Sequence, residues 1–415
     1  MVLLSHPTGN ANVRNALLAL YERNMLEAFY TTVAWDEGSL WNKLLPENLS
    51  RELKRRSYPA IPSRLIHTSA FAELARVLSL RLGLRSLSGT PEAPLSPNRL
   101  NQHVDHLAAR AVAVQPPTAV YAYTSGALQT FRAARKRGVK TLYEVPIAHW
   151  HYMRNFLADE AERQPAFAGT LPHLAVVPEE LQREDEEIEL ADQVIVPSHY
   201  VLSTLPTSVP PSKVRVIPYG APSANGGPVH RSRHGGKLRV LYVGALTQRK
   251  GLSYLLDAIK KVEGNIDFTI IGSKVGECEL LREPLQRYNW IPTAPNSAVL
   301  EAMRNQDVLI LPTLVEGFAL VILEAMSQGM TVITTPNSGG LEAIRDGVDG
   351  FIIPIRSSDA IAEKIEILAA DRDLLYAMSQ AALSRSQECS WERYRQQLGD
   401  TVAQILDTEG NICRA

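Results

Sequence analysis

The sequence predicts an α/β protein with two domains, each built on a parallel sheet. Short apolar runs alternate with longer segments of helical periodicity, which is typical of a parallel α/β sheet. The 415 residues are too many for one ordinary domain and sufficient for two hydrophobic cores. The alternation stops at residues 221–237, which are rich in Gly, Pro, Ser and Arg, and then restarts. We therefore expect an N-terminal domain over 1–220, a linker over 221–237 and a C-terminal domain over 238–389. A terminal helix in 390–415 is expected to pack back toward the first domain.

The first half contains five apolar runs that fit buried strands and three segments that fit helices. A short run that is apolar throughout suits a parallel strand covered by helices on both faces. The expected strands are Met1–Leu4, Ala119–Tyr123, Thr141–Val145, Gln193–Val196 and Val214–Ile217. The expected helices are Asn12–Arg23, Ala127–Arg137 and Leu181–Leu190. Residues 39–101 are less regular, and their elements are not ordered by this pattern.

The second half repeats the alternation more tightly. Its expected strands are Arg239–Val243, Asp267–Ile271, Asp307–Leu311 and Thr331–Thr334. Its expected helices are Tyr254–Val262, Ala298–Met303 and Ala319–Gln328. Residues 390–406 fit an amphipathic helix, because apolar side chains recur on one face: Trp391, Tyr394, Leu398, Val402 and Ile405.

Composition and charge narrow the class of protein. The formal net charge is −1, so no overall field attracts the chain to nucleic acid. Cys278, Cys389 and Cys413 lack metal-ligand spacing, which favours reduced thiols. The first residues show no signal-peptide pattern, and the most apolar window, Asp307–Met326, is interrupted by Pro, Gly and Glu. We therefore expect a cytoplasmic protein.

Several basic segments are compatible with a peripheral contact with a membrane. Residues 51–56 and 132–140 are basic runs, and the helix-like segment 71–87 carries several arginines. Such surfaces attract anionic lipids or an anionic lipid-linked acceptor. Solvated faces over a core are the favoured interpretation, and contact with the inner face of a membrane is the alternative.

The segment 307–350 carries the strongest chemical pattern. Glu316 follows the expected strand Asp307–Leu311, at the edge where open α/β sheets bind ligands. Unpaired amides of Gly317, Phe318 and Ala319 would open the next helix and favour a phosphate or a sugar hydroxyl. Glu324 is about two helical turns further, within reach of a ribose diol. Because acidic residues are common in the first turns of helices, the spacing alone also fits ordinary surface carboxylates.

Two further loops that follow expected strands are candidates for binding an anion or a sugar. In Val243–Gly251, a strand leads into adjacent cations, Arg249 and Lys250, which could stabilise the charge on a departing pyrophosphate. A solvated loop pair is the alternative. Near the N-terminus, Gly9 and Asn10 form a strand–helix turn that can direct backbone amides at an anion or a sugar. An ordinary turn capped by Asn10 or Asn12 is equally compatible with the pattern.

The two glutamates with seven residues between them resemble the motif of the family-4 retaining glycosyltransferases. The resemblance continues through further positions: Gly329, Thr331–Thr334, Gly339-Gly340 and Asp349-Gly350-Phe351. It implies the GT-B fold, in which two facing Rossmann-like domains enclose an interdomain cleft. It also implies that Glu316 approaches the donor sugar and that Glu324 holds the nucleotide ribose.

The resemblance assigns roles to the other loops as well. Val243–Gly251, with Gly244, resembles the phosphate-binding loop of the family, but Ala245 stands where many members carry arginine, and Arg249 is the candidate replacement. His149 follows the strand Thr141–Val145, where a family histidine lies beside the reacting sugar, and His151 is the reserve candidate. The turn at Gly9 and Asn10, with Arg14 beyond it, resembles the family's first glycine-rich loop without its Gly-Gly pair.

The resemblance therefore implies a retaining hexosyltransferase that uses a UDP-, GDP- or ADP-sugar and needs neither metal nor cofactor. The acceptor would be a saccharide, a lipid-linked glycan or a small molecule, as in polysaccharide or glycoconjugate biosynthesis. A catalytically silent nucleotide-sugar-binding subunit and a nucleotide-sugar epimerase on the same fold are the alternatives. The sugar, the acceptor and the oligomeric state stay open at this point.

Overall fold

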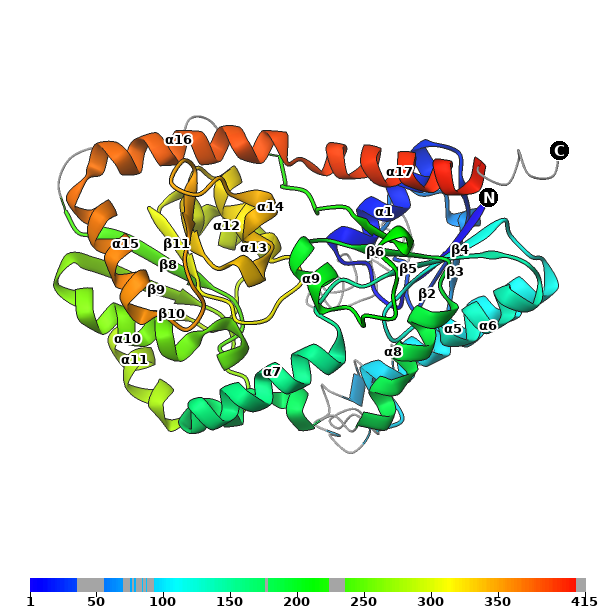
Figure 1. The fold of residues 1–415 in the computed structure, drawn as a ribbon, viewed down its shortest axis with the longest axis horizontal. Coiled ribbons are helices and arrows are strands. Elements are labelled where there is room, and N and C mark those ends of the chain that lie inside the picture. The colour runs from blue at the N-terminus through cyan, green and yellow to red at the C-terminus, as the bar shows by residue number, and fades with distance from the viewer. Residues whose placement is uncertain are drawn as a thin grey trace.

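The protein, seen in a computed structural model, consists of two α/β domains that lie side by side (Figure 1). The structure describes residues 1–35, 56–69, 75–76, 78–79, 84, 87, 93–175, 178–223 and 236–407. Most of the expected linker, residues 224–235, lies outside the described residues, as do residues 51–55, most of 71–87 and the end of the chain from 408.

The N-terminal sheet is parallel throughout, with the strand order β3-β2-β1-β4-β5-β6-β7. The strands are β1 (Val2–Ser5), β2 (Leu26–Thr31), β3 (Ile66–Thr68), β4 (Ala119–Tyr123), β5 (Lys140–Glu144), β6 (Gln193–Val196) and β7 (Val214–Val216). The helices are α1 (Ala11–Glu22), α5 (Pro97–Val114), α6 (Leu128–Lys136), α7 (Trp150–Arg163), α8 (Pro178–Leu190) and α9 (His199–Thr204). The 3-10 turns are η2 (Ser63–Leu65), η3 (Pro165–Thr170), η4 (Pro172–Ala175) and η5 (Pro211–Lys213).

The C-terminal sheet is also parallel, with the order β10-β9-β8-β11-β12-β13. Its strands are β8 (Leu238–Val243), β9 (Ile266–Ile271), β10 (Asn289–Ile291), β11 (Val308–Leu311), β12 (Thr331–Thr334) and β13 (Gly350–Ile352). The helices are α10 (Leu252–Val262), α11 (Arg282–Arg287), α12 (Asn296–Arg304), α13 (Leu320–Ser327), α14 (Gly340–Ala343), α15 (Ser358–Ala370), α16 (Arg372–Glu388) and α17 (Trp391–Asp407). The 3-10 turns are η6 (Gln248–Lys250), η7 (Glu263–Asn265), η8 (Glu279–Leu281) and η9 (Pro336–Ser338).

The strand orders locate the places where ligands can bind. In the second sheet β8 pairs with β9 on one side and with β11 on the other, so the order reverses between β8 and β11. Open α/β sheets bind ligands outside the carboxyl ends of the strands at such a reversal. The loops after β8 and β11 meet at this point of the sheet, through a hydrogen bond from the amide of Leu314 to the carbonyl of Arg249. The first sheet has the same reversal between β1 and β4.

The chain passes between the domains twice near residues 221 and 390. The amide of Ala221 donates to the carbonyl of Cys389 at 2.6 Å, and Ala221 forms a bridge with Ser390. Beyond this crossing, α17 returns to the N-terminal domain and packs against α1 (Figure 1). Two ion pairs join these helices, Arg23 with Asp400 and Arg395 with Glu22.

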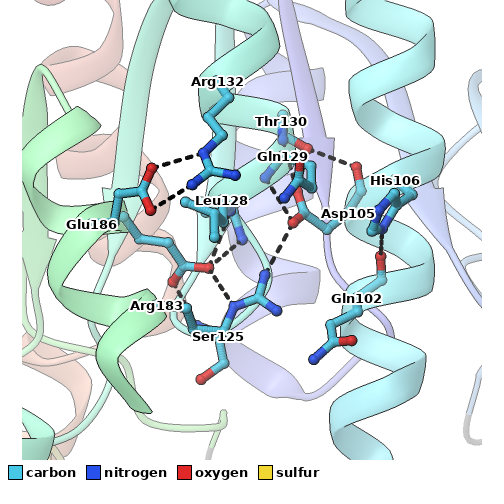
Figure 2. A network of polar contacts seen from close by, with 12 residues as sticks. Gln102, Asp105, His106, Ser125, Leu128, Gln129, Thr130, Arg132, Arg183 and Glu186 are labelled. Carbon is cyan, nitrogen blue, oxygen red and sulfur yellow. Dashed lines mark hydrogen bonds and ion pairs between the residues drawn. The ribbon is translucent and has the colours of Figure 1, made fainter. Parts of the chain in front are cut away.

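A buried polar network fixes the start of α6 inside the N-terminal domain. The carboxylate of Asp105 accepts hydrogen bonds from the amides of Gln129 and Thr130, and that of Glu187 accepts from the amide of Leu128. Arg183 lies between these two carboxylates, and Figure 2 shows it between Asp105 and the loop before α6. Carboxylates at a helix N-terminus satisfy its unpaired amides, so this network holds α5, α6 and α8 together.

The expected strands are all present within a residue or two, and the structure adds elements that were not expected. The additions include β2, β3, β10, β13, α5 and α7. β3 and β10 are short edge strands whose residues are largely half-buried or exposed, so they lack a clear apolar pattern. Within the described ranges, no helix has the length and apolar character needed to cross a bilayer.

Candidate active site at the domain interface

The loop between β8 and α10 holds Arg249 and Lys250 in a tight turn. Oγ1 of Thr247 accepts from the amide of Arg249 at 3.4 Å, and Gly251 ends the turn with a φ of 74°. This left-handed conformation favours glycine. A Cβ on Gly251 would lie 2.0 Å from the carbonyl oxygen of Pro312, so the loop after β11 also excludes a side chain here. The turn therefore presents two consecutive cations to the loop after β11.

Glu316 lies between these two cations. Nη1 of Arg249 donates to Oε2 of Glu316 at 3.0 Å and to the carbonyl of Val315 at 2.9 Å. Nζ of Lys250 contacts the same Oε2. The amide of Leu314 donates to the carbonyl of Arg249 at 2.9 Å, which joins the two loops through their backbones. The structure thus brings Arg249, Lys250 and Glu316 together at the reversal point of the C-terminal sheet.

The electrostatics of this cluster favour an anionic ligand. Burial alone would raise the pKa of Glu316, but the adjacent Lys250 and Arg249 lower that pKa to about 2. The carboxylate is therefore ionised at neutral pH. Two cations and one carboxylate leave a net positive charge, and all three side chains are at most 15% exposed. A charge so poorly screened by water interacts strongly with an incoming anion.

Glu324 lies in the second turn of α13, and its side chain contacts a residue outside this cluster. Its Oε1 accepts from Nδ2 of Asn296 at 2.9 Å. Burial raises the pKa of Glu324, and the hydrogen bond from Asn296 opposes that shift. Among the described residues, the contact of Glu324 is thus with the start of α12 rather than with Lys250 and Glu316. Asn296 was not singled out in the sequence, because its contact spans two helices.

Gly317 packs its backbone against the N-terminal domain. A Cβ here would lie 1.7 Å from the carbonyl oxygen of Pro146, and the carbonyl of Gly317 accepts from Oγ of Ser198 at 2.7 Å. Ser198 also caps α9 by accepting from the amide of Val201. The loop after β11 therefore touches the loops after β5 and β6 across the domain interface.

The prediction of three unpaired amides before α13 is wrong for Ala319. Its amide donates to the carbonyl of Ser338 at 2.8 Å, because the loop turns toward η9 before the helix begins at Leu320. Phe318 is buried, and its ring lies 5.8 Å from that of Tyr219. Gly244 likewise uses its amide within the sheet, donating to Ile271 at 2.9 Å.

The N-terminal turn is occupied by structural contacts. Oδ1 of Asn10 accepts from the amide of Val13 at 3.1 Å and caps α1, which is the alternative that the sequence left open. A Cβ on Gly9 would lie 2.2 Å from the phenol oxygen of Tyr58. The guanidinium of Arg14 lies 5.8 Å from the ring centroid of the same tyrosine.

His149 is buried at the start of α7, where the sequence placed a site histidine. Its amide donates to Oγ1 of Thr204 at 3.0 Å, and its Nε2 lies 3.2 Å from Oδ1 of Asp185. Burial lowers the pKa of His149 to about 4, against the opposing effect of Asp185, so the ring is neutral at pH 7. His151 is exposed, and its Nε2 lies 3.2 Å from Oδ2 of Asp185.

Asp185 was not singled out in the sequence, and Asn12 was considered only as a helix cap. Asp185 also accepts from Nε1 of Trp150 at 3.0 Å, so one carboxylate faces three consecutive aromatic side chains. Asn12 donates to the phenol oxygen of Tyr219 at 3.2 Å, and that phenol donates to the buried carboxylate of Glu144. These contacts join residues far apart in the chain, so no local pattern could indicate them.

Potential metal ligands do not gather at this site. Across the part of the chain that the structure describes, no three His, Cys, Asp or Glu side chains form a group that could hold a metal ion.

The C-terminal domain is similar to known proteins. Residues 230–385 match the family described as Glycosyl transferases group 1. An uncharacterized glycosyltransferase of Methanocaldococcus jannaschii is 29% identical over 157 residues, which are 37% of this chain and 44% of that protein. The capsular polysaccharide biosynthesis glycosyltransferase CapM of Staphylococcus aureus is 31% identical over 143 residues, or 32% of this chain and 37% of that protein. The alignments thus span less than half of these two relatives.

Structural likeness extends over both domains. Sucrose-phosphate synthase from Thermosynechococcus elongatus superposes with a TM-score of 0.66 at 17% identity, covering 98% of this chain and 99% of that chain. HepE from Anabaena in complex with UDP-glucose superposes with a TM-score of 0.59 at 16% identity, covering 97% and 99%. The chain therefore has the GT-B fold that the sequence resemblance implied.

Proposed function

We propose that this chain, whose C-terminal domain belongs to the Glycosyl transferases group 1 family, transfers a hexose from a nucleoside-diphosphate sugar to a saccharide, lipid-linked or small-molecule acceptor. The observation that carries the proposal is the convergence of Arg249 and Lys250 on Glu316 at the reversal point of the C-terminal sheet. This cluster is buried, positively charged overall and placed where a nucleotide ligand enters an open α/β sheet. A diphosphate is the anion that fits its charge and position.

The charge of the cluster suits a leaving group that gains negative charge. When the bond between the anomeric carbon and the phosphate oxygen breaks, its electron pair remains on the diphosphate. Cations fixed at that point interact more strongly with the transition state than with the bound donor, which raises kcat. Arg249 and Lys250 hold the diphosphate and neutralise its charge, as a divalent cation would. Glu316, released from them, accepts hydrogen bonds from the sugar hydroxyls.

The reaction is proposed to retain the anomeric configuration. The acceptor oxygen forms its bond with the anomeric carbon on the face from which the diphosphate departs. The departing phosphate oxygen takes the acceptor proton, so no carboxylate acts as a nucleophile. His149, neutral at pH 7, offers its ring and main chain to orient the sugar. Glu324 is proposed to hold the ribose, with Asn296 placing its carboxylate.

Relatives and structural neighbours support the proposed classes of donor and acceptor. HepE is a structural neighbour in complex with UDP-glucose, which supports a nucleotide-sugar donor here. Salmonella typhimurium lipopolysaccharide 1,2-N-acetylglucosaminetransferase is 27% identical over 248 residues, or 53% of this chain and 65% of that protein. Together with CapM, it supports a role in polysaccharide biosynthesis. We further propose that the acceptor binds over the N-terminal domain.

A thermal-shift screen over UDP-, GDP- and ADP-sugars tests the proposal. A ligand that binds only the folded protein stabilises it by about 2.7 kcal/mol at 100 times its Kd. We expect one nucleotide class to raise the Tm clearly and the free diphosphate nucleotide of that class to do the same. Transfer is then followed with that donor and a panel of glycan acceptors.

The outcomes of this screen separate the three functions. Transfer to an acceptor supports the proposal. Binding without turnover on any acceptor would identify a silent donor-binding subunit, and epimer formed from the donor alone would identify an epimerase. No thermal shift with any nucleotide sugar at millimolar concentration would overturn the assignment of the diphosphate site.

A further inference from the structure

A segment of the N-terminal domain reaches across and docks on the C-terminal domain. The segment, which we call the strap, comprises α7 and η3, residues 150–170, and follows β5 of the first sheet. In Figure 1, α7 runs from the first domain toward α10 and α11 of the second. Gly169 packs so closely there that a Cβ on it would lie 2.4 Å from the carbonyl oxygen of Glu277.

The end of the strap is hydrogen-bonded to the loop that carries the two cations. The carbonyl of Thr170 accepts from Oγ1 of Thr247 at 2.6 Å, and Oγ1 of Thr170 accepts from the amide of Gln248 at 2.9 Å. Thr170 and Gln248 are fully buried. Gln248 immediately precedes Arg249 and Lys250, so these contacts act on the turn that presents the cations.

Glu160, in the middle of the strap, binds the same turn through a side chain that is 0% exposed. Its Oε1 accepts from Nε2 of Gln248 at 2.8 Å and from the phenol of Tyr254 at 3.0 Å. Its Oε2 accepts from Nε of Arg356 at 2.7 Å. The side-chain amide of Gln248 also contacts Ser253, at the start of α10: its Nε2 donates to Oγ of Ser253, and its Oε1 accepts from the backbone amide of Ser253. Glu160 therefore holds the side chain of Gln248, which in turn connects the cation-bearing loop to the first turn of α10.

Further contacts with the strap position Arg356 for its ion pair with Glu160. Arg356 adopts a φ of 62°, which is uncommon for a residue other than glycine, and its guanidinium lies 4.5 Å from the ring centroid of Phe156 on the strap. Its second nitrogen, Nη2, pairs with Asp159 at 2.7 Å. A buried charge that lost its partner would be unfavourable, so Glu160 and Arg356 hold each other in place.

We propose that Glu160 and Thr170 are positioning residues for transfer: they act through Gln248 to hold Arg249 and Lys250 in line with the donor diphosphate. The inference rests on the proposed function for its catalytic part. It means that the cation-bearing loop of the C-terminal domain has its working geometry only while the strap of the N-terminal domain is docked. Separation of the domains would then loosen the loop, and the diphosphate would be gripped only in the closed molecule.

The comparison of Glu160→Gln with Asp159→Asn tests the proposal in the full-length protein. Both changes remove one negative charge facing Arg356, but only Glu160 also accepts from Gln248 and Tyr254. The first readout is hydrogen exchange of the amides of residues 247–253 without ligand. We expect Glu160→Gln to speed this exchange by about tenfold or more, because a glutamine offers one acceptor oxygen to three donors that now share the two oxygens of Glu160. Asp159→Asn should leave it within about twofold of the wild type.

The second readout is steady-state transfer with the donor found in the screen. Because the cations act mainly on the charge that develops in the transition state, Glu160→Gln should lower kcat far more than it raises the donor KM. A residue that supported only folding would lower the amount of active protein and leave kcat per folded molecule unchanged. Thr170→Val serves as a second variant, which removes one contact with the loop and keeps the side-chain shape.

The outcomes distinguish this inference from the proposed function. Equal exchange in the loop for Glu160→Gln and the wild type would overturn the positioning role, whether or not the protein transfers sugar. Equal effects of Glu160→Gln and Asp159→Asn would also overturn it. Faster exchange confined to the loop, in a protein that binds no nucleotide sugar, would retain the mechanical link and reject the proposed function.

Discussion

At the scale of single residues, Lys250 and Glu316 differ in what their removal leaves behind. In Lys250→Met, Arg249 still faces Glu316, so one cation balances one carboxylate. In Glu316→Gln, two cations would face each other in a site with little exposure to water, which is unfavourable. Loss of Lys250 should therefore weaken the interaction with a bound anion more than it lowers the stability of the domain.

We expect Lys250→Met to lower kcat about 10²- to 10³-fold, the effect typical of removing one group that stabilises developing charge. The Tm should change little. Lys261→Met is the control, because Lys261 is 44% exposed and pairs with Ser358 and Asp359 on the surface. Steady-state kinetics and thermal unfolding of both variants check the prediction. Transfer by Lys250→Met within a few-fold of the wild type would contradict the diphosphate role of the lysine.

At the scale of elements, the loop between β8 and α10 depends on the backbone of Gly251. Its φ of 74° disfavours an alanine by about 1–2 kcal/mol. The carbonyl of Pro312, 2.0 Å from the Cβ position, adds a steric conflict that can be relieved only by moving the loop. Gly251→Ala should therefore lower the free energy of unfolding by more than the conformational cost. It should also lower the transfer rate, because misplacing catalytic groups by about 1 Å can cost about 10²-fold.

Gly347→Ala is the matched control for that variant. Gly347 has the same φ of 74° and lies in the same domain, but no described residue other than its chain neighbours comes within 4 Å of its Cβ position. It should show the conformational cost of about 1–2 kcal/mol alone and normal transfer. Denaturant titration gives the free energy of unfolding of the two variants, and initial rates give their transfer activity. Similar losses of activity in both would show that the close approach to Pro312 is unimportant.

The same loop shows how far sequence patterns reach. β8, β11 and β12 were predicted because buried parallel strands are continuous apolar runs. Arg249, Lys250 and Glu316 were expected at one site from the family resemblance, and the structure brings them together because loops that follow neighbouring parallel strands meet at one sheet edge. Glu160 and Gln248 could not be predicted, since their contact joins residues 88 positions apart in different domains. The paired amide of Ala319 was missed because its partner, Ser338, lies in another loop.

At the scale of the whole molecule, the two domains are connected on either side of their interface by different elements. The strap docks the first domain on the second, whereas α17 extends from the C-terminal domain and packs on α1. Leu398 and Val402 of α17 are completely buried there. The helix that ends the C-terminal half of the chain is thus part of the core of the N-terminal domain. The stability of that domain should depend on it, while the diphosphate site should not.

Leu398→Ala tests this division. Truncating a buried leucine costs about 2–5 kcal/mol, which should appear as faster hydrogen exchange in β1, β4 and α1. Exchange in β8, β11 and the loop 244–251, and the affinity for the donor nucleotide, should stay close to the wild type. Leu280→Ala, at a side chain that is 55% exposed, should change neither domain by more than about 0.5 kcal/mol. If Leu398→Ala weakened nucleotide binding as strongly as it destabilised α1, then α17 would transmit strain into the C-terminal domain. The strap would then not be the main route by which the first domain influences the diphosphate site.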